Sequence, residues 1–146
     1  MAGYSPQPLI EKLGIKSGMK IAILDSPKAF TSTLKLPNDI GIAKQGKEFD
    51  AIMYFSNSFG ALRKKLPALR NMIKQDGMIW ICWPKTGAKL LGDFKEDDVR
   101  RLAIGLQLVD VKVAAVDETW SGLKLVIPVA LRTLPAGKSR SKLGLV

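Results

Sequence analysis

Short apolar runs alternate with amphipathic segments along the chain, and this alternation predicts the order of strands and helices. Three runs rich in branched or aromatic residues predict strands at 19–24, 49–55 and 78–83. The run at 78–83 has no polar alternation, which is typical of a central strand covered on both faces. A weaker run at 40–43 predicts a short edge strand. Two further strands, 109–116 and 123–129, are joined by residues 117–122, a connection short enough to favour an antiparallel hairpin.

Helices are expected between these strands. Apolar positions at helical spacing predict helices over 8–14 and 96–107. Ser26 followed by Pro27 is typical of a helix start, because serine caps free amides and proline lacks an N–H that would otherwise stay unbonded. This helix is expected to run from Pro27 to about Leu34.

An amphipathic helix is expected after Ser56-Asn57-Ser58, which offers helix caps. It places four apolar side chains on one face: Leu62, Leu66, Leu69 and Ile73. Pro67 lies inside this pattern and is expected to kink the helix or restart it. Asp76-Gly77 is then expected to turn the chain into the next strand.

The alternation of strands and helices predicts an α/β fold, in which a mostly parallel sheet lies between two layers of helices and ends in an antiparallel hairpin. Residues 1–131 are expected to form a single domain. Residues 132–146 are rich in Pro, Gly, Ser and Lys with no core-facing pattern, and we expect them to form a basic, disordered C-terminal tail.

In such a sheet, ligands bind beyond the carboxyl ends of the parallel strands. If the strand at 109–116 runs parallel to the others, the hairpin tip lies at the same edge. The sequence then brings ten candidate ligand-binding residues to one edge: Asp25, Ser26, Ser56, Asn57, Trp83, Lys85, Asp117, Glu118, Trp120 and Ser121.

Several of these segments resemble known families. The Leu-Gly-Ile-Lys-x-Gly-Met-Lys segment before the first strand, Phe49-Asp50, and Asp76-Gly77-Met78 resemble class I methyltransferases, as does the closing helix and hairpin. Other segments, including 3–5, 12–16, Trp83-Pro84-Lys85 and above all 117–123, look like a family of small bacterial proteins of unknown function. That resemblance covers most of residues 3–128. It implies a bacterial origin and a Rossmann-like, methyltransferase-like core, and it implies no known activity.

The chain departs from the methyltransferase pattern in two places. Those enzymes carry a glycine-rich turn after the first strand, whereas residues 25–30 here contain no glycine and include Pro27. An acid at the end of the second strand, which would hold ribose hydroxyls, has no clear counterpart. These departures disfavour S-adenosylmethionine, so the cofactor stays unknown. A dinucleotide site and a P-loop are disfavoured as well, because neither motif occurs.

Several candidate residues have a purely structural interpretation. Trp83 fits a lid over the core, and Trp80 is expected deeper on the same face of the strand. Trp120 either fastens the hairpin tip to the edge or contacts a ligand. Asp117 and Glu118 fit turn caps better than an acid–base pair, and Lys85 fits an ordinary surface lysine or an anion ligand.

Composition narrows the chemistry further. The chain of 146 residues contains no histidine and one cysteine, which excludes histidine-dependent catalysis and any internal disulfide. We therefore assign no catalytic residue and no metal ligand, and we interpret Cys82 as a buried apolar residue. With no signal peptide and no membrane-length apolar run, a cytoplasmic location without membrane contact is expected.

The net charge of +10 suggests weak, salt-dependent binding of polyanions. This binding would involve the tail and the basic residues of the amphipathic helix, which are Arg63, Lys64, Lys65, Arg70 and Lys74. The sequence favours a non-enzymatic binding or regulatory module that presents the strand ends to a small ligand or a protein. The alternatives are an S-adenosylmethionine-dependent methyltransferase-like enzyme and an accessory protein for nucleic acids or other polyanions.

Overall fold

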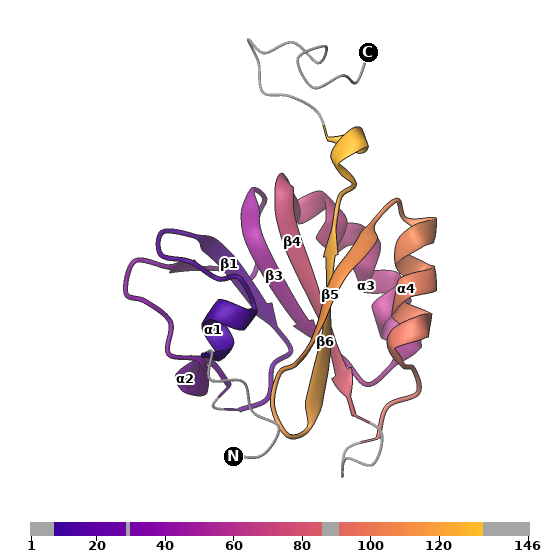
Figure 1. Cartoon of the computed structure of the whole chain (residues 1–146), viewed down its shortest axis with the longest axis horizontal. Helices are drawn as coiled ribbons and strands as arrows, with labels where there is room; N and C mark the ends of the chain where they lie inside the picture. Colours follow the sequence, from indigo (N-terminus) through magenta and orange to yellow (C-terminus); the bar gives the residue numbers. More distant parts are fainter. Residues whose placement is uncertain (1–7, 29, 86–90, 133–146) are drawn as a thin grey trace.

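A computed structural model describes residues 8–28, 30–85 and 91–132, and these form a sheet with helices on both faces (Figure 1). The strand order is β2-β1-β3-β4-β6-β5. The strands are β1 (Lys20–Leu24), β2 (Gly41–Ile42), β3 (Phe49–Phe55), β4 (Ile73–Pro84), β5 (Val109–Ala115) and β6 (Trp120–Val126). The six strands expected from the hydrophobic pattern are therefore present, and the predicted edge strand is β2.

The strand directions place the hairpin tip at the edge where the parallel strands end. Strands β2, β1, β3 and β4 are parallel, and β6 is antiparallel to both β4 and β5. Strand β5 therefore runs in the direction of β1, β3 and β4, as the expected shared edge requires. In Figure 1 this edge and the tip of the hairpin lie at the bottom of the view.

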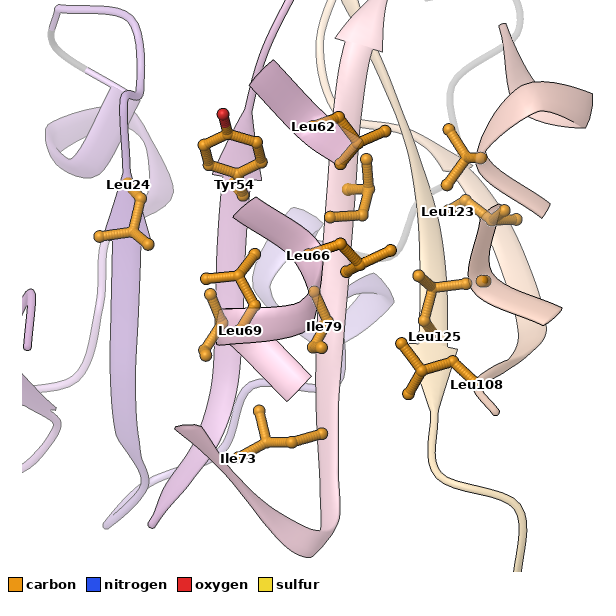
Figure 2. Packing of buried hydrophobic residues seen from close by; sticks show 14 of the residues in the cluster. Leu24, Tyr54, Leu62, Leu66, Leu69, Ile73, Ile79, Leu108, Leu123 and Leu125 are labelled. Atoms are coloured by element: carbon orange, nitrogen blue, oxygen red, sulfur yellow. The ribbon is translucent and has the colours of Figure 1, made fainter. Parts of the chain in front are cut away.

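Helices cover the sheet in two layers. They are α1 (Leu9–Lys12), α2 (Phe30–Leu34), α3 (Phe59–Met72) and α4 (Glu96–Gly105), followed by a 3-10 turn, η1 (Val129–Leu131). Leu62, Leu66 and Leu69 of α3 are buried on one face of the sheet, together with Val99 and Ala103 of α4 (Figure 2). The opposite face packs against α1, α2 and the loop after α1. The predicted three-layer α/β fold is confirmed.

Helix α3 corrects the expectation that the helix restarts at Pro67. The helix continues unbroken through this proline to Met72, and Ile73 already belongs to β4. Proline removes the hydrogen bond to the carbonyl of Arg63, but Arg63 and Pro67 both lie on the exposed side of the helix. The helix therefore lacks this hydrogen bond on its solvent-exposed side.

The expected turn at Asp76-Gly77 is instead an irregularity inside β4. The register moves from Phe49 opposite Ile73 to Ala51 opposite Met78, so residues 74–77 lie opposite Asp50 alone. A Cβ atom on Gly77 would be 2.8 Å from the Phe49 carbonyl oxygen. Glycine therefore permits this close approach of two strands, and it does not end a turn.

Two other boundaries differ from the prediction. Helix α2 begins at Phe30 and not at Pro27, and the Phe30 amide donates to the Pro27 carbonyl. Strand β6 begins at Trp120, so Trp120 and Ser121 belong to the strand and the hairpin tip covers 116–119. Residues 133–146 of the expected tail lie outside the described residues. No helix in the described ranges is long and apolar enough to cross a membrane.

Candidate functional site

The carboxyl ends of β1, β3, β4 and β5 form what we call the C-terminal edge. Backbone bonds join neighbouring parts of this edge. The Lys85 amide donates to the Thr119 carbonyl at 2.8 Å, which ties the end of β4 to the hairpin tip. The Asp93 amide donates to the Asn57 carbonyl at 3.2 Å, which holds the segment before α4 against the end of β3.

Asp25 supplies the turn that directly follows β1. Its φ of 55° lies in the left-handed region, which glycine usually occupies and which Asp tolerates better than most residues. The turn therefore forms although the segment contains no glycine. Asp25 is exposed, and Ser26 is half-buried beside it. Helix α2 is described from Phe30 onward, so Ser26 and Pro27 precede it, whereas the sequence-based expectation begins the helix at Pro27.

Tyr54 is a residue of this edge that the sequence pattern did not single out. Its side chain is 4% exposed, and Figure 2 shows its hydroxyl pointing toward the carboxyl ends of the strands. Burial raises the pKa of this hydroxyl, the Ser56 side chain lowers it by hydrogen bonding, and the Asp25 carboxylate raises it. Tyr54, Ser56 and Asp25 therefore form one interacting group. Inside an apolar run, a tyrosine is indistinguishable from a core residue.

The loop between β3 and α3 is ordered by its own side chains. Ser56 Oγ accepts from the Ser58 amide at 3.1 Å, and Ser58 Oγ accepts from the Ala61 amide at 3.2 Å as the N-cap of α3. Asp93 Oδ1 accepts from the Phe59 amide at 2.6 Å. The Asn57 side chain remains exposed. Most polar groups of this loop therefore satisfy backbone amides at the start of α3.

Asp117 organises the hairpin tip. Its Oδ1 atom accepts from the amides of Thr119 and Trp120, at 2.7 and 2.8 Å. This is the capping role expected for a carboxylate in a tight turn. Glu118 is exposed at the tip, whereas Ser121 is half-buried in β6, opposite Trp83 and Ala115.

Trp83 and Trp120 close opposite faces of the sheet at this edge. Trp83 is 5% exposed and packs against Phe94 on the α3 and α4 side. Trp120 is 8% exposed and packs edge-to-face on Phe55, with ring centroids 5.1 Å apart, on the α1 and α2 side. Both rings are therefore part of the core.

Trp80 lies on the other face from Trp83, contrary to the expectation that they share one. The two residues are three positions apart, and side chains along a strand alternate between faces. The indole N–H of Trp80 donates to the Leu13 carbonyl at 2.9 Å and fixes the loop after α1 on the sheet. The neighbouring Cys82 is fully buried, and burial raises the pKa of its thiol, which confirms its interpretation as a core residue.

Strand β2 ends well before the C-terminal edge. Its last residue, Ile42, lies opposite Ile21, whereas β1 continues to Leu24. The next residues are Ala43 and Lys44. No carboxylate at the end of β2 therefore reaches the edge in the described part of the chain.

The basic surface expected on α3 is smaller than the sequence pattern implied. Arg63, Lys64 and Lys65 are exposed on the helix. Lys74 is not on the helix at all; it lies in β4, with its Nζ 2.9 Å from Asp50 Oδ1. Arg70 is half-buried and its Nη2 donates to the Gln107 carbonyl at 3.4 Å.

The fold is similar to that of several solved structures. No family model matches the chain, and its sequence matches no curated protein. Among solved structures, a SAM-dependent methyltransferase from Aquifex aeolicus has a TM-score of 0.57 at 15% identity, over 82% of this chain and 87% of that chain. A magnesium protoporphyrin IX methyltransferase with bound SAH, from Synechocystis PCC 6803, has a TM-score of 0.54 at 10% identity, over 80% and 78%.

A ribosomal protein L11 methylase from Lactobacillus delbrueckii subsp. bulgaricus is also similar, with a TM-score of 0.52 at 14% identity over 82% and 74% of the two chains. At these identities the likeness concerns the fold. The chain has a Rossmann-like, methyltransferase-like core, as the resemblance noted in its sequence implied.

Proposed function

We propose that this protein binds S-adenosylmethionine, or a nucleoside ligand of the same type, at the C-terminal edge of its sheet, and that methyl transfer is the activity this binding serves. The left-handed turn at Asp25 carries the proposal. It places a left-handed bend directly after β1, at the position where the methyltransferase pattern has its glycine-rich turn. The main objection from the sequence, the absence of glycine, concerned this turn.

Charge at the edge supports a cationic ligand. The chain has a net charge of +10, yet Asp25 and Glu118 are both exposed at the C-terminal edge. S-adenosylmethionine carries a positive sulfonium, and a nearby carboxylate attracts a positive charge. The demethylated product, S-adenosylhomocysteine, lacks the sulfonium charge, so carboxylates at this edge favour the methylated form.

The fit to the methyltransferase pattern is partial. The turn after β1 is present, but β2 stops opposite Ile21 and offers no carboxylate for ribose hydroxyls. Ligand binding here would depend on the turn at Asp25 and on the ends of β3 and β4. For this reason we derive no chemical step for the transfer itself.

Ligand binding is tested by calorimetry and thermal unfolding with S-adenosylmethionine, S-adenosylhomocysteine and adenosine. A ligand at about 100 times its dissociation constant stabilises the native state by about 2.7 kcal/mol, which raises Tm measurably. Asp25→Asn removes the charge but keeps a residue that tolerates the left-handed region. We expect it to weaken S-adenosylmethionine binding more than adenosine binding.

Asp76→Asn is the matched control, because Asp76 is an exposed carboxylate near the other end of β4. It should leave both affinities unchanged. The proposal fails if none of the three compounds changes Tm at millimolar concentration, or if the two variants have the same effect.

A second function, binding without catalysis, is favoured by the short β2 strand and by the backbone contacts that already use most polar groups of this edge. The two functions are separated by incubating the protein and a cell extract with S-adenosylmethionine labelled at the methyl group. Binding with no transfer of label to any extract component favours the non-enzymatic module.

A further inference from the structure

Two lysines face each other directly in the β5–β6 hairpin. Lys112 is the register partner of Lys124, and directly opposed residues in an antiparallel pair project from the same face of the sheet. That face is the one covered by α1, because Lys124 also lies opposite Trp80. Like charges directly opposite each other are destabilising. The hairpin therefore tolerates a repulsion that a neutral residue at either position would remove.

Both ammonium groups lie against the end of α1. Lys112 Nζ donates to the Lys12 carbonyl at 2.9 Å. Lys124 Nζ lies 3.8 Å from the position that a Cβ atom on Gly14 would occupy. The lysines thus converge on the loop that follows α1, where Gly14, with a φ of 77°, packs against the end of the Met78 side chain and Lys124.

Lys16, in the same loop, adds a third positive charge. Burial is the main cause that lowers the pKa of Lys124, and the charges of Lys112 and Lys16 lower it further. No carboxylate of the described residues is among the groups that act on Lys124. The position of Lys112 is explained by the end of α1, because its bond to the Lys12 carbonyl is a favourable interaction at a helix C-terminus. The positions of Lys16 and Lys124 have no such explanation.

We propose that Lys16, Lys112 and Lys124 form a phosphate-binding site beside Gly14, which takes the phosphate groups of a polynucleotide or of a small phosphate ester. A phosphate beside Lys112 and Lys124 is attracted by the positive charges of all three lysines and offsets their mutual repulsion, and lysine binds phosphate as a point charge. Lys16 and Lys112 are exposed and can reach such a ligand from solvent. This site lies on the face of the sheet, away from the C-terminal edge, so it is independent of the function proposed above.

Two probes separate the sources of phosphate. Tripolyphosphate represents the small ligands, and a fluorescent single-stranded oligonucleotide represents the polynucleotides; binding is measured by calorimetry and polarisation over a series of salt concentrations. The test variant is K16Q/K124Q. The control is K64Q/K65Q, which removes the same charge from exposed positions of α3, on the opposite side of the sheet.

K16Q/K124Q is expected to weaken binding by about tenfold or more, and for the oligonucleotide to reduce the slope of log affinity against log salt by about 1.4, two phosphate contacts on a single strand. K64Q/K65Q should change affinity less than twofold. The probe that shows this difference identifies the source. Equal losses in both variants, or no binding of either probe at low salt, overturn the proposal.

Thermal unfolding keeps the test decisive if a variant alters stability. Without anion, Lys124→Gln should be at least as stable as the parent protein, because it removes a repulsion. With tripolyphosphate or the oligonucleotide, Tm should rise for the parent protein and rise much less for Lys124→Gln. The same rise in both proteins also overturns the proposal.

Discussion

The C-terminal edge and the lysine group beside Gly14 are both rich in charge, but they differ in what those charges contact. At the edge, Asp93 and Asp117 accept hydrogen bonds from backbone amides at 2.6 to 2.8 Å. Beside Gly14, Lys124 has two other lysines as its charged neighbours. A carboxylate that accepts hydrogen bonds from backbone amides has a role in local structure. Clustered lysines repel one another, and nothing in the local structure offsets that electrostatic cost.

The two regions therefore offer different groups to a ligand. At the C-terminal edge, the residues free for a ligand are the ones left over after turns and caps are satisfied, chiefly Asp25, Asn57 and Glu118. On the face of the sheet, the lysines themselves form the candidate site. If the contacts at the C-terminal edge are structural, replacing Trp120 costs the most stability there, and replacing Asp117 or Asp25 costs less.

Trp120→Ala is expected to cost about 3–5 kcal/mol of unfolding free energy, the usual loss for truncating a buried aromatic residue. The ring packs on Phe55, and truncation leaves a cavity at the end of the sheet. Trp120→Phe keeps part of that packing and should lose less. Chemical denaturation measures both, and a loss below 1 kcal/mol for Trp120→Ala would place the ring in a ligand site and not in the core.

Asp117→Ala is expected to cost about 1–2 kcal/mol, because two amides of the hairpin tip lose their acceptor. The matched control is Glu118→Ala, an exposed neighbour whose replacement should stay within about 0.5 kcal/mol. Equal effects of the two substitutions, in urea unfolding, would contradict the capping role of Asp117.

Asp25→Val is expected to cost about 1–2 kcal/mol, since a branched residue is strained in the left-handed region. Asp25→Gly should be neutral or slightly stabilising, because glycine adopts this conformation without strain. If Val and Gly at position 25 have the same Tm, the turn after β1 does not require the left-handed conformation.

The lowered pKa of Asp50 predicts that the free energy of unfolding depends slightly on pH. Burial raises the pKa of this carboxyl, but the bonds from the Lys20 amide at 2.8 Å and the Lys74 ammonium at 2.9 Å outweigh burial and hold it below the usual value. The contribution is complete above the pKa of the unfolded chain, 3.8, and is lost as pH falls through the lower pKa of the folded state.

The matched variant for this effect is Asp50→Asn. It should be less stable than the parent protein at pH 7, and the difference between the two should shrink as the pH is lowered below 4. A difference in unfolding free energy that stays constant from pH 7 to pH 2 would contradict the lowered pKa of Asp50.

Local patterns in the sequence are sufficient to predict the strands, the helices and their arrangement in three layers. Strand β3 has the predicted limits, Phe49–Phe55, because its apolar run lies between the polar residues Glu48 and Ser56 and acts locally. The continuity of the helix through Pro67 and the place of Gly77 inside a strand do not follow from such local patterns. The effects of these two residues depend on solvent access to a carbonyl and on the approach of a neighbouring strand, and neither is a property of the adjacent residues.

The candidate sites depend on register, which the sequence alone leaves open. The contacts of Trp120 follow from the start of β6, and the opposition of Lys112 and Lys124 follows from the pairing of the hairpin. Shifting that pairing by one residue would move one of the lysines to the other face of the sheet. The sequence does not identify Tyr54 as a residue of the edge, because the interaction of its hydroxyl with Ser56 and Asp25 depends on how the ends of β1 and β3 are placed together.

The bond from Trp80 to Leu13 also has a kinetic consequence. It joins residues 67 positions apart, and the contact of Lys112 with Lys12 spans 100 positions. Contacts of such long range form slowly, because most of the chain must already be arranged before they close. The N-terminal segment is therefore expected to dock last during folding, and protection of the Trp80 indole N–H in pulsed hydrogen exchange would report that final step.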